Sequence, residues 1–333
     1  MLTLVIIIIA LALLFDFLNG MNDAANSIAT IVSTRVLSPR LAVLWAAFFN
    51  FVAAFGFGVG VANTIGKGIV DVTIVNEYMI LSALVGAIVW THLCTRFGLP
   101  ISVSHSLIGG LAGAGVAKAG VGALVVSGLT KVVLFIFLSP TLGMLVAFLL
   151  MVGVMWAVRK STPNKVDRTF RVGQLISSAA YSLGHGTNDA QKTMGIIALV
   201  LFTSGYLGEN FYVPVWVILS AHAAIGLGTY LGGWKVVRTM GMKLTHLRPM
   251  GGFCAETAGA SILLGTAFAG IPVSTTHTIA GAIIGVGSTR RLSAVRWGIA
   301  GKIVWAWVLT IPASAGVAAL AYYIVNWVHT LLT

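Results

Sequence analysis

Long apolar runs recur along nearly the whole chain, and they restrict its fold more than any other feature. They lie at residues 2–15, 41–62, 78–90, 121–138, 142–158, 213–234 and 297–328. A helix needs roughly 20 apolar residues to cross a bilayer core about 30 Å thick. Hydrophobic residues make up 58% of the chain and charged residues only 8%, against roughly 25% charged residues in soluble domains. The sequence therefore predicts an all-α polytopic membrane protein.

The net charge of +12 suggests nucleic acid as an alternative partner. The basic residues, however, lie in short loops between apolar runs, chiefly at 159–171 and 235–248. Lys and Arg prefer the cytoplasmic side of a membrane, so this distribution is typical of a membrane protein. We therefore expect the chain to lie in a lipid bilayer and to have no nucleic-acid partner.

The first apolar run resembles the hydrophobic part of a signal peptide. It lacks a preceding basic segment, and it is followed by Asp16 and a Gly/Asn-rich segment where a cleavage site would have small residues. We interpret the run as a retained transmembrane helix. No organelle-targeting pattern is recognisable, which favours the plasma membrane, meaning the inner membrane of a prokaryote, with a multi-pass arrangement.

Three landmarks occur twice, in the same order, and indicate an internal repeat. The landmarks are GMNDAANS at 20–27 with GTNDAQKT at 186–193, LPISVSHSLIGGLAGAG at 99–115 with IPVSTTHTIAGAIIGVG at 271–287, and Lys131…Pro140 with Lys302…Pro312. Three ordered features at nearly constant spacing indicate two homologous halves. We expect a first inverted repeat at 1–158, a basic cytoplasmic linker at 159–171 and a second inverted repeat at 172–333.

Halves of this kind often lie in opposite orientations in the membrane, and inversion requires an odd number of crossings in each half. We expect about five per half. The expected crossings are 3–34, 40–65, 75–95, 121–138 and 139–158, and then 172–203, 213–234, 250–268, 297–311 and 312–329. The Gly- and Ser/Thr-rich segments around Ser104 and Thr276 are too short and too polar to cross, so each predicts one re-entrant helical hairpin.

The positions of the basic residues predict the orientation. If the N-terminus is external, the basic stretches 159–171 and 235–248 both lie on the cytoplasmic side. Arg290, Arg291 and Arg296 lie outside in this arrangement and oppose it. Four crossings per half would give parallel repeats and an external linker, which the charge distribution disfavours. We expect both termini to be external.

Two aspartates, Asp23 and Asp189, follow long apolar stretches at equivalent positions of the repeat. An ionised carboxylate at that depth is costly and usually serves a function. Gly and Asn precede each aspartate and tolerate non-helical backbone, so a helix broken there would offer oxygens to a cation and amides to an anion. Helix capping by Asp and Asn is the alternative. Glu256 also lies in an apolar run and needs a partner or a bound cation.

The two Ser/Thr-rich turns are matched between the halves. Ser102, Ser104 and Ser106 correspond to Ser274, Thr276 and Thr278, with Thr275 in addition. Hydroxyl groups donate hydrogen bonds without adding charge, which suits a multi-oxygen anion that must also be released. The preceding prolines can break a helix and the following glycines permit close backbone approach. The alternative is that small polar residues merely pack membrane helices together.

Four further polar residues have less certain roles. Lys192 has no charged counterpart in the first motif, where Asn26 stands, and it either pairs with a carboxylate or supplies positive charge to an anion. Gln191 beside it offers amide donors. His105 and His277 do not have the spacing of a zinc site, and we interpret them as residues that stabilise the hairpins by hydrogen bonding.

Together these motifs resemble the inorganic phosphate transporter (PiT) family. The resemblance is carried by GMNDAANS, GTNDAQKT, TMGMKLTHLRPMGGFCAETAGA at 239–260 and GIPVSTTHTIAGAIIGVG at 270–287, and it spans both halves. It implies a symporter that imports inorganic phosphate with sodium or protons, by alternating access to a midplane site between the repeats. It also implies a homodimer. Some relatives are similar to sulfate permeases, so another oxyanion is the alternative substrate.

The resemblance places phosphate and sodium ligands in the repeated motifs. The implied phosphate ligands are Asn22, Ser102, Ser104, Ser106, Thr187, Asn188, Gln191, Lys192, Ser274, Thr275, Thr276 and Thr278. The implied sodium ligands are Asp23, Asn26, Asp189 and Glu256. One departure is Asn50, because some family members carry an acidic residue at that position.

Two other functional classes compete with a secondary active transporter. An intramembrane hydrolase would use Asp23 and Asp189 as an acid–base pair, but each aspartate lies in the same Asn/Gly context, which is expected of ion sites. An anion channel would need a pore lined by basic residues, and few basic residues lie within the apolar runs. We expect no enzymatic activity, no cofactor, and sodium ions as the coupling ions.

Overall fold

The computed structural model describes residues 2–56 and 58–332, and this part of the chain folds into helices without a β-strand. Its α-helices are α1 (Leu2–Ser33), α2 (Pro39–Val52), α3 (Gly60–Gly68), α4 (Glu77–Phe97), α5 (Val103–Ala119), α6 (Val126–Ala157), α7 (Pro163–Thr203), α8 (Val215–Leu231), α9 (Trp234–Lys243), α10 (Pro249–Phe268), α11 (Thr275–Ser288) and α12 (Trp297–Leu332). Within the described residues, four helices are long and apolar enough to cross a membrane, or up to six if each bent pair is one span. The all-α polytopic prediction is confirmed.

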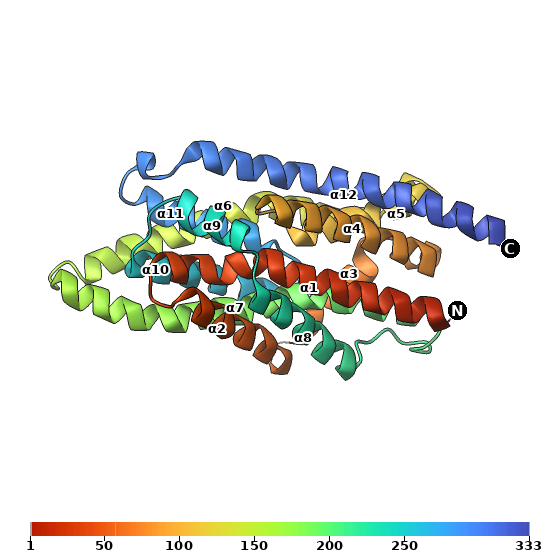
Figure 1. Cartoon of the computed structure of the whole chain (residues 1–333), viewed down its shortest axis with the longest axis horizontal. Helices are drawn as coiled ribbons and strands as arrows, with labels where there is room; N and C mark the ends of the chain where they lie inside the picture. Colours follow the sequence, from red (N-terminus) through yellow and green to blue (C-terminus); the bar gives the residue numbers. More distant parts are fainter. Residues whose placement is uncertain (1, 57, 333) are drawn as a thin grey trace.

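Helices α1 to α6 and α7 to α12 repeat the same order of elements. Each repeat begins with a long helix that carries the NDA motif, continues with a bent helix pair and a hairpin, and ends with a long proline-containing helix. The equivalent helices α1 and α7 run in opposite directions, and so do α6 and α12 (Figure 1). Both termini lie at one end of the molecule and the α6–α7 loop at the other. The loop with Arg290, Arg291 and Arg296 lies at the end of the α6–α7 loop (Figure 1), where the amide of Arg296 donates to the backbone oxygen of Leu244, so the expectation that it lies on the side of the termini was wrong. The predicted inverted repeats are confirmed.

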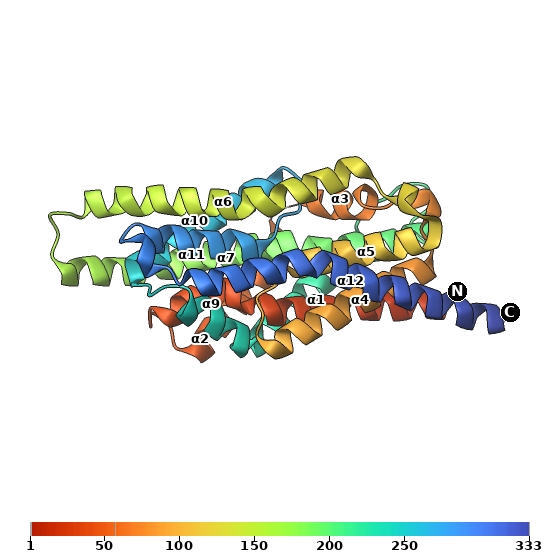
Figure 2. The same cartoon turned by 90° about the horizontal axis from the view of Figure 1, so that it is seen from above.

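The hairpin of each repeat has its tip in the middle of the molecule (Figures 1 and 2). Helices α4 and α10 run inwards from opposite ends, and α5 and α11 return to the ends from which the chain came. At the tips, Gly98 and Gly270 have positive φ angles of 70° and 66°, a conformation that glycine adopts readily. The two tips meet, since the ring centroids of His105 and His277 lie 4.8 Å apart. Both predicted re-entrant hairpins are confirmed.

The repeats interlock, because the last helix of each one packs along the hairpin of the other. Helix α12 packs along α4 and α5, and α6 packs along α10 and α11. Gly113 and Gly285 occupy equivalent places in these contacts. A Cβ atom on Gly113 would lie 2.2 Å from the carbonyl oxygen of Ala315, and one on Gly285 would lie 2.2 Å from that of Met144. The glycine-rich sequence after each tip therefore permits close helix packing.

Some expected boundaries were wrong. Pro140 lies inside α6 and Pro312 inside α12, so the two spans expected on either side of each proline form a single helix. A proline is tolerated in a membrane helix because neighbouring groups satisfy the freed backbone. The spans expected at 75–95 and 250–268 are the inward arms of the hairpins. Helix α7 begins within the expected linker, since proline is well suited to the first helical position.

Candidate functional site

Two buried aspartates lie at the centre of the molecule, one on each of the equivalent helices α1 and α7. Asp23 and Asp189 are fully buried, and Oγ1 of Thr275 lies 3.3 Å from Oδ2 of Asp23 and 3.0 Å from Oδ2 of Asp189. Thr276 donates to Oδ1 of Asp23 over 3.2 Å. Ligand atoms of Asp23, His185 and Asp189 all lie within 4.8 Å of one another. The second hairpin tip thus joins two like-charged groups.

The expectation that the helices break at the NDA motifs was wrong, because α1 and α7 continue through them. The glycine of each motif serves another purpose. A Cβ atom on Gly20 would lie 2.2 Å from the carbonyl oxygen of Ile225 in α8, and one on Gly186 would lie 2.5 Å from that of Asn50 in α2. The glycines allow a neighbouring helix to approach closely. The non-helical backbone at this site belongs to the hairpin tips instead.

The asparagines of the first motif connect α1 to both hairpins. Nδ2 of Asn26 donates to Oγ1 of Thr276 over 2.9 Å and lies 3.3 Å from Oγ1 of Thr275. Nδ2 of Asn22 donates to Oγ1 of Thr95, near the end of α4, over 2.8 Å. Asn22 and Asn26 are fully buried, so their amide groups orient the tips around Asp23.

In the second motif, Lys192 makes the corresponding connections. Its ammonium group donates to Asp189, to Oγ of Ser104 in the first hairpin, and to the backbone oxygen of Val273 over 2.8 Å. Lys192 is 1% exposed. Nearby, Oδ1 of Asn188 accepts from the amide of Val273 over 3.4 Å. Of the two roles that the sequence left open for Lys192, pairing with a carboxylate is the one observed.

The hairpin tips bring the N-termini of α5 and α11 together. Amide groups in the first turn of a helix have no partner within the helix, and the end carries partial positive charge, so an anion is stabilised there. Ser102 and Ser274 cap the two helices by accepting from the amides of His105 and His277 over 3.2 and 3.3 Å. Thr278 donates back to the backbone oxygen of Ser274 over 2.9 Å. Ser102, Ser274 and Thr278 therefore shape the tips.

The two histidines at the tips contact each other and an aromatic neighbour. Besides its edge contact with His105, the ring of His277 stacks on Trp307 of α12 with centroids 3.8 Å apart. Nε1 of Trp307 donates to the backbone oxygen of Pro100 over 3.0 Å. Ring packing thus holds the first tip against the second tip and α12. The hydrogen bonding expected of these histidines is not observed, because Nδ1 of His105 and both ring nitrogens of His277 have no hydrogen-bond partner in the part of the chain that the structure describes. Ring stacking stabilises the tips instead, and it depends on the tertiary contact with Trp307.

Several buried polar atoms at the tips have no hydrogen-bond partner among the described residues. They include Oδ1 of Asn22, Oδ1 of Asn26, Oγ of Ser106 and Nδ2 of Asn188, besides Nδ1 of His105 and both ring nitrogens of His277. Leaving a buried polar group unpaired costs roughly 1–3 kcal/mol, so their presence around one centre indicates a ligand site. The amide oxygens suit a hard cation, whereas the hydroxyl and the amide nitrogen can donate to an anion. These residues fit a cation and an oxyanion bound beside each other.

Glu256 forms a separate buried network on α10. Its Oε1 accepts from Oγ1 of Thr30 over 2.6 Å and from Nε2 of Gln174 over 3.0 Å, and its Oε2 accepts from Oγ of Ser177 over 2.5 Å. Oε1 of Gln174 in turn accepts from Oγ1 of Thr34 over 2.8 Å. Within the described chain, Glu256 has no basic side chain in ion-pair contact. This carboxylate is stabilised by neutral donors.

The partners of Glu256 were missed by the sequence reasoning. A signal was present, because Thr34, directly after the end of α1, follows Thr30 by four residues, and Gln174 and Ser177 are three residues apart on α7. Residues at these spacings share one face of a helix. A polar pair on one face of a membrane helix indicates a buried partner, but which helix supplies that partner depends on the tertiary fold.

Two expected phosphate ligands lie away from the hairpin tips. Oε1 of Gln191 accepts from the amides of Val61 and Ala62 over 2.8 and 3.3 Å, and so caps the start of α3. Thr187 donates to a backbone oxygen one turn earlier. Both line a cavity of about 160 Å³ together with His222. They occupy the face of α7 opposite the site around Lys192.

Asn50 orients the site from α2. Its Oδ1 lies 3.1 Å from Nδ1 of His185, and its Nδ2 donates to Oγ1 of Thr229 over 3.0 Å. Nε2 of His185 lies 3.2 Å from Oδ2 of Asp189. Asn50 therefore fixes the imidazole ring that faces Asp189, and links α2, α7 and α8.

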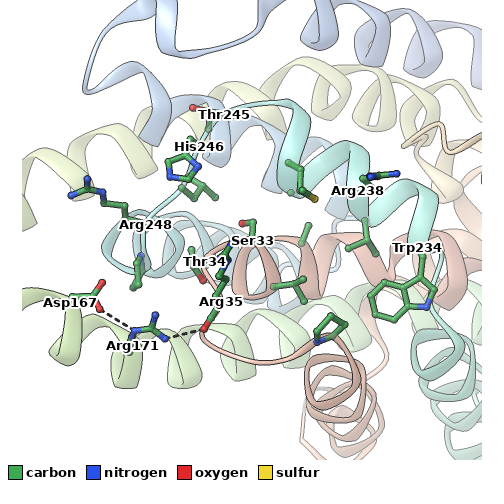
Figure 3. A pocket seen from close by; sticks show the side chains of 18 of the residues that line it. Ser33, Thr34, Arg35, Asp167, Arg171, Trp234, Arg238, Thr245, His246 and Arg248 are labelled. Carbon is green, nitrogen blue, oxygen red and sulfur yellow. Dashed lines mark hydrogen bonds and ion pairs between the residues drawn. The ribbon is translucent and has the colours of Figure 1, made fainter.

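A cavity of about 850 Å³ lies at the end of the molecule that holds the α6–α7 loop (Figure 3). Arg35, Arg171, Arg238 and Arg248 surround it. Its acidic lining residue, Asp167, accepts from Arg171 over 3.0 Å. Within the described residues the other three arginines form no ion pair. The cavity is therefore strongly basic and attracts anions.

This cavity, which we call the basic vestibule, connects to the buried network of Glu256. Thr34 lines the vestibule and donates to Gln174, which donates to Glu256. Thr30 follows Asn26 by one helical turn on α1 and also donates to Glu256. Polar side chains thus lead from the hairpin tips to the basic vestibule, with one helical turn of α1 between Asn26 and Thr30.

Comparison with known proteins places these features in a family. Residues 19–165 and 158–318 each match the phosphate transporter family, which agrees with two repeats. The chain is 60% identical over 316 residues to a probable low-affinity inorganic phosphate transporter of Rhizobium meliloti, covering 95% of both chains. It is 44% identical to a protein of the same description from Bacillus subtilis, covering 98% of this chain and 99% of that one.

A solved structure shares the whole fold. It is described as the sodium-dependent phosphate transporter, and it superposes with a TM-score of 0.88 at 29% sequence identity. The match covers 98% of this chain and 99% of that chain. The similar proteins are transporters by description rather than enzymes.

Proposed function

This chain belongs to the phosphate transporter family, and we propose that it imports inorganic phosphate across the plasma membrane in symport with sodium. The observation that carries this proposal is the meeting of two helix N-termini beside two buried carboxylates. The N-termini of α5 and α11 suit an oxyanion, whereas Asp23 and Asp189 suit cations. Helix ends that bind substrate at the midplane between inverted repeats are typical of secondary transporters.

The proximity of the carboxylates to the anion site explains coupling. Two like unit charges 4 Å apart repel by roughly 4 kcal/mol at an effective dielectric constant of 20. Phosphate beside an uncompensated Asp23 is therefore disfavoured, and a sodium ion at that carboxylate removes the repulsion. Each ligand then strengthens binding of the other by the same factor. Phosphate and sodium therefore bind together more readily than either ligand binds alone.

The ligands that we propose follow from the geometry. Sodium binds Asp23 with the free amide oxygens of Asn22 and Asn26, and a second cation site lies at Glu256 along the route to the vestibule. Phosphate accepts from the amides of the first turns of α5 and α11 and from Ser106 and Asn188. The hydroxyl of Ser104 can donate to phosphate while it still accepts from Lys192. The hydroxyls of Thr275 and Thr276 complete the anion site after turning from their present partners.

The sidedness that we propose puts the basic vestibule in the cytoplasm and both termini outside. Basic side chains concentrate on the cytoplasmic side of membrane proteins, and Arg35, Arg238 and Arg248 gather at the vestibule. Phosphate leaving the hairpin tips would pass Glu256 and enter a cavity of attractive potential. The vestibule then acts as the release route.

Uptake by purified protein in liposomes tests this function. With labelled phosphate outside, an inward sodium gradient should drive accumulation above the external concentration, and an equal potassium gradient should not. Asp23→Asn should abolish the accumulation, and Asp71→Asn, the same change at an exposed aspartate, should leave it intact. Equal accumulation with either cation would reject sodium coupling. Strong competition by sulfate would point to a broader oxyanion permease.

A further inference from the structure

The repeated motif carries different residues at one position of the site. Asn26 on α1 and Lys192 on α7 each follow the motif aspartate by three residues. We propose that the Lys192 ammonium group is a tethered cation that takes the place of a coupling ion at Asp189, so that the transporter moves one cation fewer per phosphate than a symmetric site would require. This inference rests on the proposed function and adds a coupling ratio to it.

The contacts of Lys192 are those of a cation in a binding site. Its ammonium group meets a carboxylate oxygen of Asp189, the hydroxyl oxygen of Ser104 and the backbone oxygen of Val273. Hard cations in proteins take this set of carboxylate, hydroxyl and carbonyl oxygens. The three groups come from α7 and from both hairpin tips, so the ammonium joins the elements that a mobile ion would otherwise join.

These contacts also argue against Lys192 as a direct phosphate ligand. An ammonium group has three donors, and the three observed acceptors use all of them. The side chain is 1% exposed, so its position is set by packing. Lys192 affects phosphate through the charge that it compensates at Asp189.

The equivalent place in the first repeat has no such charge. Asn26 is neutral and donates to the threonines of the second tip. The recorded partners of Asp23 are the hydroxyls of Thr275 and Thr276, and no basic side chain forms an ion pair with it in the part of the chain that the structure describes. The pair Asp189 and Lys192 is neutral as a unit, whereas Asp23 needs a mobile cation.

The tethered cation changes what the transporter can achieve. A mobile ion at the second aspartate would add its own gradient to the driving force, but a lysine side chain cannot leave. Without a membrane potential, a tenfold sodium gradient multiplies the attainable phosphate accumulation by about ten for each coupled ion, so an additional ion at Asp189 would raise the accumulation about tenfold further. The replacement thus gives up driving force and removes the need to bind a second ion.

The test compares Lys192→Asn, which copies Asn26, with the wild-type protein and with Lys165→Asn, the same change at an exposed position of α7. Labelled sodium and phosphate are followed together in liposomes, and sodium bound per protein is measured at saturating phosphate. We expect Lys192→Asn to take up about one additional cation per phosphate and to show a steeper sodium dependence. Lys165→Asn should match the wild type.

A reciprocal variant keeps the test decisive if Lys192→Asn does not fold. Asn26→Lys places a second tethered cation beside Asp23, so phosphate binding should persist while its dependence on sodium is lost. An unchanged number of bound and transported cations in Lys192→Asn, or an unchanged sodium dependence in Asn26→Lys, would overturn the inference. If the wild type itself ignores sodium, the proposed coupling ion is wrong. The inference would still hold if Lys192→Asn gained dependence on any cation, including protons.

Discussion

Helices α1 and α7 are equivalent parts of the two repeats, yet their buried faces differ in polarity. Ile8, Leu11 and Asn26 of α1 correspond to Gln174, Ser177 and Lys192 of α7. The neighbouring helices differ in the same way, because Leu84 of α4 corresponds to Glu256 of α10. One end of the molecule therefore holds a buried hydrogen-bond network, and the other end holds an apolar cluster.

The difference shows that the repeated fold and the diverged side chains have separate roles. Two identical inverted halves would offer the same route to either side of the membrane. Here the polar end joins the basic vestibule through Thr34 and Gln174, and in the proposed function a hydrated ion leaves by this end. The apolar end is sealed by Ile8 and Leu84, and opening it requires the helices to separate. The repeat builds a central site, and the diverged side chains make its two routes unequal.

The largest effect on stability is expected when a carboxylate equivalent to Glu256 is introduced into the apolar end. Leu84→Glu buries a charge with no partner, and the free energy of unfolding should fall by about 3–5 kcal/mol. Thermal unfolding in detergent measures the loss. Leu84→Met, which conserves volume, should cost less than about 1.5 kcal/mol. Wild-type stability in Leu84→Glu would show that both ends already accommodate a carboxylate.

A smaller effect should distinguish the two motif aspartates. Asp189→Asn leaves the Lys192 ammonium without its counter-charge, and stability should fall by about 1.5–3 kcal/mol. Asp23→Asn removes a carboxylate with neutral partners only, so the protein should keep its stability and lose sodium-driven accumulation. Thermal unfolding and uptake are measured on the same preparations. Equal loss of stability in both variants would mean that Lys192 does not distinguish the repeats.

The hydroxyls of the two hairpin tips should contribute similarly to phosphate affinity. Ser104 and Thr276 occupy equivalent places, and a hydrogen bond to a charged group contributes roughly 1.5–3 kcal/mol. Ser104→Ala and Thr276→Ala should each weaken phosphate affinity by about 10- to 150-fold. Thr203→Ala, at the end of α7, serves as the matched control. If both tip variants keep normal phosphate affinity and lose only thermal stability, these hydroxyls merely support the hairpins.

The smallest effect is expected where the polar network keeps its shape and loses its charge. Glu256→Gln retains side-chain length, and its amide can still accept from Thr30 and Gln174. Stability should change by about 1 kcal/mol, while the sodium concentration for half-maximal uptake should rise. Uptake over a range of sodium concentrations measures this. An unchanged sodium dependence would assign Glu256 to packing of the polar end rather than to cation binding.

The architecture could be predicted from the sequence because the two halves of the chain can be compared with each other. Matching GMNDAANS with GTNDAQKT, and the two Ser/Thr-rich turns with each other, predicted inverted repeats and both hairpins. Helix ends were less predictable, since Pro140 and Pro312 break helices in water and are tolerated in membrane helices. The glycine of each NDA motif was taken for a helix break, although Gly20 serves a close contact with α8. That contact lies far along the chain, and local pattern does not reveal it.

The site was predictable as a set of motifs and not as a geometry. The tips, both aspartates and Lys192 lie together, and this could be predicted because each belongs to a repeated landmark. Gln191, next to Lys192 in the chain, points to the other face of α7 and caps α3. The partners of Glu256 come from α1 and α7. Such assignments depend on which helices pack together, and this information is not contained in any single segment.

The central claim is that phosphate and sodium bind at one site and depend on each other. Phosphate affinity of the purified protein, measured by calorimetry over a wide range of sodium concentrations with ionic strength held constant, tests it most directly. Affinity should rise about tenfold for each tenfold rise in sodium below saturation, and phosphate should raise sodium affinity by the same overall factor. Asp23→Asn should abolish this dependence. Phosphate affinity that does not change with sodium in the wild-type protein would contradict the account.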